Sequence, residues 1–580
     1  MTSPVRARSD LLLCSFLFLA ALTFFLTSAL TRVKQPVAQD ELWWLVAGET
    51  LYRTGAPVLY TNPGAVIAHS PHLYLRSIHF AFRLFGESET IARIPGILAG
   101  LLALLGVFIS TRTFAPGSDI EKIKLASLTS LLYGTTPALI QGAAILDIDN
   151  TLLIPASLFL FFSFVRYQKE NKARWAILTA IAMAIALWAR VTAPTMIAFL
   201  LFFYVTMSRG HLKTKTVSVG MIVFGFFIFF VSWYFYCRVA AVPFATPFEY
   251  SLDALRGRLK STGGLTSTHL LQNLICLVLW LGPFATILFL FSFLGRIRDF
   301  VRHRAWSPED IYLLGSLFFL AGYTFVGGTP FGFPKYHSPG IALCYTYLGI
   351  STGKIGDLFS IRFRNLILLF VLAFLIQILT LSDSLYFFRY QLREALAFGI
   401  PSPDSLIRVG GERILFFIGF SGLFFMITKK FLRGKGILPA LILFSLGSNV
   451  AMATLQNKAP YQTGYNYGAR GTLETVRFIQ EHVSPQSVVI APSEIVYYLK
   501  MPHTHYLRDD FWKNPEAMRS RLIESETSAL AVSIASNTID QIRMIQRNVL
   551  IQKILRERFE NVTIGSFRVW IRKENASPDV

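Results

Sequence analysis

The sequence predicts a polytopic α-helical membrane protein that ends in a smaller α/β domain outside the membrane. Three observations support this fold class. Of the 580 residues, 53% are hydrophobic and only 15% are charged, whereas soluble chains carry about 25% charged residues. The apolar residues form long runs, and lysine and arginine gather in alternate linkers between them. The last part of the chain is polar and lacks such runs.

Thirteen apolar runs predict membrane-spanning helices, because a helix needs about 20 mainly apolar residues to cross ~30 Å of hydrocarbon. Several runs are shorter than this and would need flanking residues to complete the crossing. The runs are Leu11–Leu30, Ile94–Ser110, Leu125–Gln141, Leu152–Val165, Ala176–Ala189, Thr195–Met207, Val217–Cys237, Leu271–Leu294, Ile311–Phe325, Tyr336–Ile350, Leu366–Leu381, Ile414–Ile427 and Ile437–Leu455.

The distribution of basic residues predicts the orientation of these spans. With the N-terminus in the cytoplasm, the six inner linkers hold 21 lysines and arginines in 70 residues, and the six outer linkers hold 16 in 153. Cytoplasmic loops carry the excess of basic residues in membrane proteins, and an odd number of spans then puts the C-terminal tail outside. These linkers explain the net charge of +21, so no nucleic-acid partner is expected.

The chain is predicted to divide into a membrane domain, residues 1–455, and a C-terminal domain, residues 456–580. Helical and β-like segments alternate in the second part, which is typical of a small α/β domain. The helical segments are Leu473–His482, Ser493–Lys500, Ala517–Ser525 and Ile539–Phe559, and the β-like segments are Ser487–Ala491, Ala529–Ser533 and Thr563–Arg572.

The first outer loop, residues 31–93, is too long for a simple connector and too apolar for a disordered segment. Asp40–Arg53 and Leu73–Phe85 have the pattern of amphipathic helices. We expect apolar side chains of the first helix to lie in the membrane interface; these are Trp43, Trp44, Leu45 and Leu51.

Asp40 and Glu41 stand directly after the first predicted span, at the outer membrane surface. An outward-facing carboxylate there can accept the proton of a hydroxyl nucleophile, a general-base role that contributes about 10²–10⁴ in rate. The alternative is structural, because acids at the start of a helix cap it and favour its dipole. Position alone leaves both interpretations open.

Asp147 and Asp149 form a second acidic site, in the second outer loop. Ionisable residues at membrane depth commonly mark functional sites. Asp149 or Asn150 could instead cap the fourth span. For this pair, too, the residues alone leave both interpretations open.

Basic residues on the same outer face are candidates for an anion site, because fixed positive charge stabilises a leaving group that becomes negative. Lys335 is the sharpest candidate, since the glycines and prolines around it break regular helix at membrane depth. The other candidates are Arg93, Arg190 and the cluster Arg256, Arg258 and Lys260. For these, snorkelling to the interface or contact with lipid headgroups are the alternative explanations.

Metal and disulfide chemistry have little support in the sequence. The cysteines lie in or beside apolar runs and have neither disulfide-type nor metal-type spacing. His69 and His72 could ligate a metal, but no carboxylate follows at a matching spacing. No cofactor is therefore predicted, although a divalent metal stays open.

These features, in this order, resemble the GT-C glycosyltransferases, in particular the branch with bacterial aminoarabinose-lipid A transferase and the protein O-mannosyltransferases. The resemblance covers the membrane half and is most specific over residues 38–165. The segments that carry it are Asp40-Glu41, Glu49, His69–Tyr74, Leu84–Glu89, Ala92–Pro95, Leu146–Leu152 and Pro334–Pro339.

The resemblance implies a GT-C-like fold and an inverting transfer of a sugar from a polyprenyl-phosphate donor to a hydroxyl of a lipid, glycan or protein. Asp40 would be the general base, and Asp147 or Asp149 would help to hold acceptor or donor sugar. Lys335 would contact the donor phosphate, with Arg256, Arg258 and Lys260 as further candidates. The residues implied to support the site are Glu41, Glu49, His69, His72, Tyr74, Arg93 and Tyr336.

One departure bears on the substrate. The aminoarabinose transferases carry Glu-Lys-Pro where this chain has His69-Ser70-Pro71, so aminoarabinose and lipid A are in doubt as donor and acceptor. The alternatives to a glycosyltransferase are a transporter or flippase of lipid-linked glycans and a non-catalytic membrane scaffold. A ligase or polymerase that uses diphosphate-linked oligosaccharides is the enzymatic alternative. The expected location is a bacterial inner membrane, with the C-terminal domain periplasmic.

Overall fold

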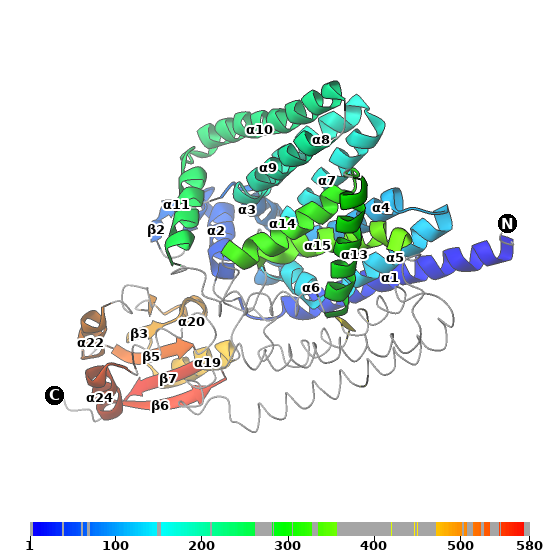
Figure 1. The fold of residues 1–580 in the computed structure, drawn as a ribbon. Helices are drawn as coiled ribbons and strands as arrows, with labels where there is room; N and C mark the ends of the chain where they lie inside the picture. The colour runs from blue at the N-terminus through cyan, green and yellow to red at the C-terminus, as the bar shows by residue number, and fades with distance from the viewer. Residues whose placement is uncertain are drawn as a thin grey trace.

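The computed structural model is a bundle of helices with a five-stranded sheet beside it (Figure 1). It describes residues 4–37, 40–59, 62–66, 70–147, 152–208, 211–261, 281, 283–303, 306–326, 335–355, 419, 446, 449–450, 471–501, 504–506, 514–523, 527–533, 545, 547–565 and 567–573. The bundle comes from the apolar part of the chain, and the sheet comes from its polar end. The predicted fold class is confirmed.

Most helices of the bundle follow the predicted apolar runs, whereas Thr246–Ser261 falls in a predicted outer linker. The helices are α1 (Pro4–Val33), α4 (Glu89–Phe114), α5 (Asp119–Thr135), α6 (Pro137–Ala144), α7 (Leu153–Glu170), α8 (Ala173–Ala189), α9 (Thr192–Met207), α10 (Leu212–Ala240), α11 (Thr246–Ser261), α13 (Pro283–His303), α14 (Asp310–Val326) and α15 (Ser338–Ile355). Within the described ranges, three stretches are long and apolar enough to cross a membrane alone: Asp10–Val33, Glu89–Phe114 and Leu212–Ala240.

The number of spans stays a prediction. Apart from a few isolated positions, Leu366–Leu381, Ile414–Ile427 and Ile437–Leu455 lie outside the described residues, as does most of the first half of Leu271–Leu294. The other predicted spans coincide with helices of the bundle.

The predicted span Leu125–Gln141 is two helices, so the expectation of one continuous helix is wrong. α5 ends at Thr135 and α6 begins at Pro137. Proline has no backbone N–H for the helical ladder and disfavours helical backbone in the residue before it. Thr136 is accordingly extended, with φ −72° and ψ 116°. All residues of α6 are buried. The second outer loop, which follows α6, therefore begins inside the protein.

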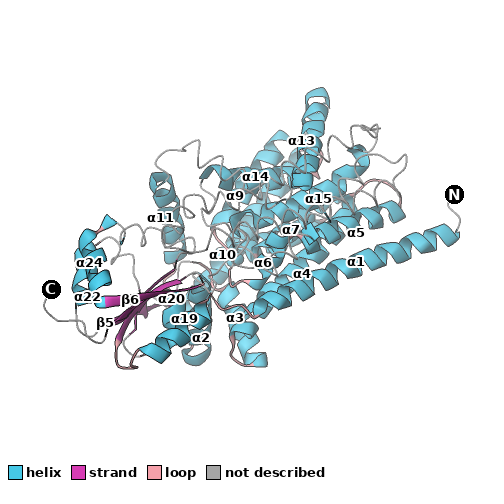
Figure 2. Cartoon of the chain, turned by 90° about the horizontal axis from the view of Figure 1, so that it is seen from below, coloured by secondary structure: helices cyan, strands magenta, loops and turns pink. Residues whose placement is uncertain are grey.

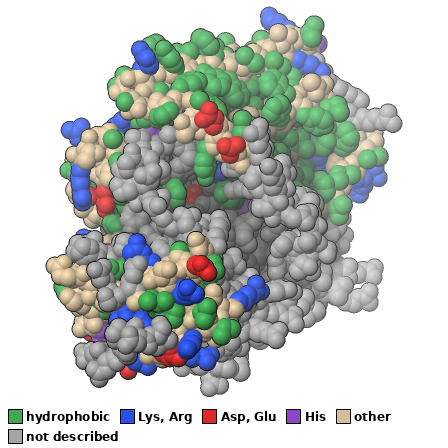
Figure 3. Space-filling view, turned by 90° about the vertical axis from the view of Figure 1, so that its left-hand side faces the viewer, with side chains coloured by type: hydrophobic (Ala, Val, Ile, Leu, Met, Phe, Trp, Pro, Cys, Tyr) green, Lys and Arg blue, Asp and Glu red, His purple; other side chains and the backbone are tan. Residues whose placement is uncertain are grey.

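The surface of the bundle is apolar where a membrane would contact it. Figure 3 shows hydrophobic side chains gathered over the bundle and charged side chains over the C-terminal part of the chain. The large exposed side chains include Ile177 of α8, Phe199 and Phe203 of α9, and Phe224 and Phe227 of α10. Such exposure is unfavourable in water and favourable against lipid.

The first outer loop folds as a layer on the bundle, made of α2 (Asp40–Thr54), β1 (Val58–Leu59), β2 (Asn62–Val66) and α3 (Leu73–Phe85). Helices form at both segments where the sequence predicts amphipathic helices. Their apolar faces pack on each other rather than on lipid, so the expected interfacial position is wrong for most of the first helix. The side chains of α2 in this core are Leu42, Trp44, Leu45 and Leu51, and those of α3 are Tyr74, Leu75, Ile78 and Phe82. On the outer face of α3, Phe80 and Phe85 remain exposed.

The C-terminal domain contains a mixed five-stranded sheet of order β4-β3-β5-β7-β6. Its strands are β3 (Val488–Ala491), β4 (Thr504–Tyr506), β5 (Thr527–Ser533), β6 (Phe559–Ile564) and β7 (Phe567–Arg572). β3 pairs in parallel with β4 and β5, and β7 pairs antiparallel with β5 and β6. The expected single strand Thr563–Arg572 is therefore a hairpin, which turns at Gly565 with φ 59°. β4 has only three residues and was not predicted.

Helices cover both faces of this sheet, as alternate side chains of a strand point to opposite faces. α19 (Thr472–His482) and α20 (Ser493–Leu499) pack with Val489 and Ala491 of β3. α22 (Pro515–Ile523) and α24 (Val549–Arg558) pack with Val488 and Ile490. Figures 1 and 2 show α20 on the side of the sheet that is nearest to α2. The predicted domain boundary at residue 455 lies outside the described residues.

Close approach of α8 and α10 depends on a glycine. A Cβ atom added at Gly225 would lie 2.7 Å from Met183 Cβ and 2.8 Å from the backbone oxygen of Ala180. A Cβ atom at Gly220, on the same helix, would meet nothing within 4 Å. Small residues allow this kind of backbone contact between membrane helices.

Gly225→Ala is expected to destabilise the membrane domain by about 1–3 kcal/mol, the usual cost of overpacking. Gly220→Ala is the matched control and should leave stability within ~0.5 kcal/mol. Thermal unfolding of the purified proteins in detergent measures both. Equal melting temperatures for the two variants would contradict the packing described here.

Candidate active site

A buried ion pair between Glu41 and Arg93 lies at the outer end of the bundle. Each side chain is 2% exposed, and Arg93 Nη2 lies 3.0 Å from Glu41 Oε1. Arg93 Nη2 also lies 3.3 Å from Oε2, and Arg93 Nε lies 3.3 Å from Oε1. The planar guanidinium therefore holds the carboxylate through both of its oxygens, a geometry that lysine cannot reproduce.

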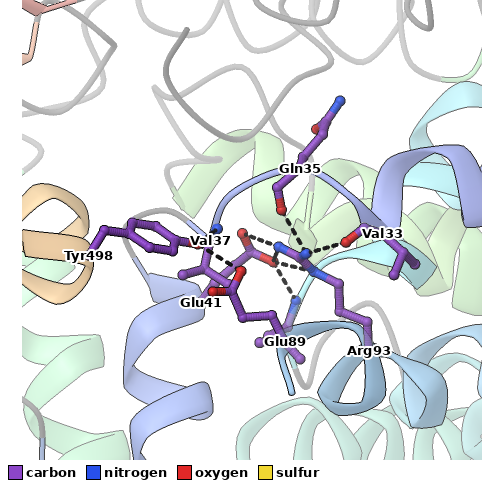
Figure 4. Close-up of polar contacts among 8 residues, drawn as sticks. Val33, Gln35, Val37, Glu41, Glu89, Arg93 and Tyr498 are labelled. Carbon is purple, nitrogen blue, oxygen red and sulfur yellow. Dashed lines mark hydrogen bonds and ion pairs between the residues drawn. The ribbon is translucent and has the colours of Figure 1, made fainter. Parts of the chain in front are cut away.

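The remaining polar groups of this pair bind backbone atoms of other segments (Figure 4). Arg93 Nη1 donates to the carbonyl oxygens of Val33 and Gln35, each at 2.8 Å. Glu41 Oε1 accepts a hydrogen bond of 3.0 Å from the backbone N–H of Leu146. The pair thus joins the end of α1, the start of α2, the start of α4 and the second outer loop.

Among the described residues, a cavity of about 10 Å³ lies beside the pair, lined by Arg32, Gln35, Pro36, Glu41, Arg93, Gln141, Ala144 and Ile145. A volume of that size holds about one water molecule. Glu41 and Arg93 contact backbone atoms of three segments, and the supporting role expected for them stays a prediction.

The pair brings the two acidic segments together. Asp40 is the first residue of α2 and precedes Glu41, and Asp147 follows Leu146, the backbone partner of Glu41. Asp147 is 3% exposed. The side chain of Asp40, and all of Asp149, lie outside the described residues.

Tyr74 of α3 lies beside this acidic group. Its ring packs edge-on against Trp44, with the ring centroids 5.4 Å apart. Burial raises the pKa of the Tyr74 hydroxyl well above its usual value, and the charges of Asp147 and Glu41 raise it further. Tyr74 is therefore a neutral side chain next to carboxylates contributed by α2 and by the second outer loop.

Glu49 lies on α2 away from the ion pair and meets the C-terminal domain. The hydroxyl of Tyr497 donates a hydrogen bond of 2.9 Å to Glu49 Oε1. Burial raises the pKa of Glu49, and the bond from Tyr497 partly opposes this rise. The structure thus gives Glu49 a contact between domains, which the sequence did not predict.

His72 belongs to a second cluster, at the N-terminus of α3. Its Nδ1 lies 2.8 Å from the hydroxyl of Tyr236 on α10. Arg76 Nε donates to the same hydroxyl at 3.2 Å, and Trp188 of α8 packs edge-on against the Tyr236 ring. His72 is fully buried. It joins the first outer loop to α10 of the bundle through the Tyr236 hydroxyl.

The basic candidates are distributed over several elements. The Arg190 guanidinium, which follows α8, lies 5.1 Å from the centre of the Tyr336 ring. Tyr336 belongs to a short 3₁₀ helix, η1 (Lys335–His337), so Lys335 is one residue from this contact. The three remaining basic candidates lie within α11, and neither their side chains nor that of Lys335 is described; they are Arg256, Arg258 and Lys260.

His69 lies outside the described residues. Within the described ranges, no group of three or more His, Cys, Asp and Glu side chains is arranged to hold a metal ion. The sequence missed three residues that complete these clusters, which are Tyr236, Tyr497 and Tyr498. A tyrosine in an apolar run or on a short helix gives no signal of a partner hundreds of residues away.

Arg93→Met is expected to destabilise the protein by about 3–5 kcal/mol, because it leaves the buried Glu41 carboxylate without its counter-charge. The matched control is Arg53→Met. Arg53 forms an ion pair with Glu87, and its side chain is 64% exposed. An exposed pair contributes about 0–1 kcal/mol. Chemical denaturation in detergent compares the variants, and similar losses for both would show that the buried pair has no special role.

Residues 69–235 match the family model of dolichyl-phosphate-mannose-protein mannosyltransferases. Among curated proteins, no sequence matches this one. The fold is similar to ArnT from Cupriavidus metallidurans bound to undecaprenyl phosphate, with a TM-score of 0.56, 14% identity, and coverage of 97% of this chain and 98% of that chain. The apo structure of the same ArnT gives a TM-score of 0.57 and 14% identity, over 96% and 97% of the two chains. The predicted resemblance is confirmed at the level of the fold: this chain has the fold of ArnT, and residues 69–235 match the mannosyltransferase family model.

Proposed function

We propose that this protein is a membrane glycosyltransferase that transfers a sugar from a polyprenyl-phosphate carrier to a hydroxyl acceptor. The observation that carries the proposal is the hydrogen bond from the Leu146 N–H to Glu41. It joins the first turn of α2 to the second outer loop and so brings Asp40 and Asp147 to one end of the bundle. The comparisons support the donor class, because the matched family is named for dolichyl-phosphate-mannose and the similar ArnT binds undecaprenyl phosphate.

In the proposed reaction, Asp40 accepts the proton of the acceptor hydroxyl while that oxygen attacks the anomeric carbon. The bond from this carbon to the carrier oxygen breaks, and the polyprenyl phosphate leaves with the bonding electrons. Attack from the side opposite the phosphate inverts the anomeric configuration. Asp147 or Asp149 holds the acceptor or the donor sugar next to Asp40.

The leaving phosphate requires positive charge on the same face. Lys335 is the proposed phosphate contact, and it lies beside the Tyr336–Arg190 contact. Arg256, Arg258 and Lys260 of α11 are further candidates. His69-Ser70-Pro71 replaces the Glu-Lys-Pro triplet of the aminoarabinose transferases, so we propose a hexose or pentose other than aminoarabinose as the donor sugar.

The site is proposed to face the periplasm of a bacterial inner membrane. Tyr497 and Tyr498 of the C-terminal domain contact Glu49 on α2 and Glu89 at the start of α4. These contacts support the proposal that the C-terminal domain lies on the same side of the membrane as the first outer loop. This arrangement requires an odd number of spans, in agreement with the predicted topology.

Asp40→Asn is expected to lower sugar transfer at least ~100-fold, because an amide cannot accept the hydroxyl proton. The assay gives purified protein in lipid a panel of radiolabelled polyprenyl-phosphate sugars and crude envelope acceptors. The matched control is Asp10→Asn, at the other end of α1, where Asp10 pairs with Lys124 2.8 Å away. It should transfer at the wild-type rate.

Transfer by the wild type and the Asp10 variant alone would establish the enzyme class and name the sugar. Normal turnover by Asp40→Asn would refute the base assignment. No transfer across the panel by folded wild type would refute the polyprenyl-monophosphate donor and favour diphosphate-linked donors or a transporter.

A tag at the C-terminus is expected to be accessible from the periplasm, and a tag at the N-terminus only after the membrane is opened. The physical reason is the excess of lysine and arginine in the inner linkers. Protease protection of tagged spheroplasts measures both ends. A C-terminal tag that is protected in intact spheroplasts would contradict the proposed topology.

A further inference from the structure

The C-terminal domain contacts the outer loop through two adjacent tyrosines at the end of α20. Tyr497 and Tyr498 pack partly buried against the core that α2 and α3 form. Their hydroxyl groups both bind residues of the membrane domain. Tyr497 bonds Glu49, on the second half of α2. Tyr498 bonds Val37, in the linker before α2, and Glu89, at the start of α4.

The Tyr498 hydroxyl makes two hydrogen bonds (Figure 4). It accepts a bond of 2.9 Å from the backbone N–H of Val37 and donates one of 2.7 Å to Glu89 Oε2. A hydroxyl has one donor and can accept as well, so both roles are filled at once. Burial raises the pKa of this hydroxyl, which keeps it protonated and able to donate to Glu89.

Val37 lies in the linker between α1 and α2, three residues before Asp40. Arg93, on α4, holds the carbonyl oxygens of Val33 and Gln35 in the same linker. Tyr498, on the C-terminal domain, binds the backbone N–H of Val37. Glu89, the other partner of Tyr498, lies one turn before Arg93 on α4. Arg93 and Tyr498 therefore both connect the linker to the first turns of α4.

We propose that Tyr498 is a positioning residue through which the docked C-terminal domain fixes the backbone that leads into Asp40. The proposal rests on the proposed function for its catalytic consequence, but the contact itself can be tested without activity. In this proposal Tyr498 has no direct part in the chemistry. It acts through Val37, and misplacement of a catalytic group by about 1 Å can lower a rate by up to ~100-fold.

A general docking role is the competing explanation, because both tyrosines attach the domain. The two can be separated, since the Tyr497 and Tyr498 hydroxyls lie on the same turn of the same helix but bind different segments. Tyr498→Phe removes the bonds to the linker and to Glu89 and keeps the ring. Tyr497→Phe removes a domain contact of the same type and leaves the linker bond intact.

The first measurement is hydrogen–deuterium exchange of the full-length protein in lipid, followed in peptides that contain Val37. Tyr498→Phe should speed exchange of the Val37 amide about fivefold, the factor expected for one lost hydrogen bond. Tyr497→Phe should leave that exchange rate unchanged. Unchanged exchange in Tyr498→Phe, or equal acceleration in both variants, would overturn the proposal.

The second measurement is steady-state transfer with the donor that the wild type uses. Tyr498→Phe should lower kcat about tenfold with the donor KM unchanged, because the base is displaced while the donor site is intact. Tyr497→Phe should keep kcat within about twofold. Equal kcat in the two variants, or a change confined to KM, would overturn the positioning role.

The two measurements separate this inference from the proposed function. If the wild type transfers no sugar but exchange at Val37 responds to Tyr498→Phe alone, the proposed function fails and the contact between the domains stands. If the wild type transfers sugar and neither measurement responds, the proposed function stands and the positioning role fails.

Discussion

The buried ion pair between Glu41 and Arg93 is the interaction on which the outer end of the membrane domain depends. Two charges at 2% exposure are costly unless every polar atom around them is used. Here the arginine binds two carbonyl oxygens of the linker as well as the carboxylate, and the carboxylate binds the N–H of Leu146. A pair of this kind adds little net stability, but it specifies one arrangement of four segments, which also pack together through Val37, Leu42, Ala92 and Leu146.

That arrangement determines how the outer loop and the C-terminal domain share one face. α2 and α3 bury their apolar sides against each other, which leaves Glu49 and the start of α4 available to the tyrosines of α20. The polar domain is thereby attached at the end of the bundle where the start of α2 and Asp147 lie. A sugar donor with a lipid tail would approach this face from the membrane, and a polar acceptor would approach it from the aqueous side.

Much of the fold follows from one-dimensional patterns. Apolar runs of sufficient length must be helices in a membrane, because no other backbone satisfies its own hydrogen bonds there, and most of them coincide with the helices observed. The patterns failed where a single proline ends a helix, and where a segment distant in the sequence covers an apolar face. Pro137 divides one run into α5 and α6, and the interfacial position expected for Trp44, Leu45 and Leu51 is replaced by contact with α3.

The sequence by itself determined the membrane character, the place of the acidic pair directly after the first predicted span and the resemblance that links Asp40 to a base. These depend on composition and on residues close together in the chain. Only the tertiary structure decided that Glu41 pairs with Arg93 and holds Leu146, and that Tyr498 reaches Val37. Residues 52, 105 and 461 positions apart meet there. Such contacts are selected by the packing of whole helices and domains, and no local pattern encodes which polar group will lie opposite another.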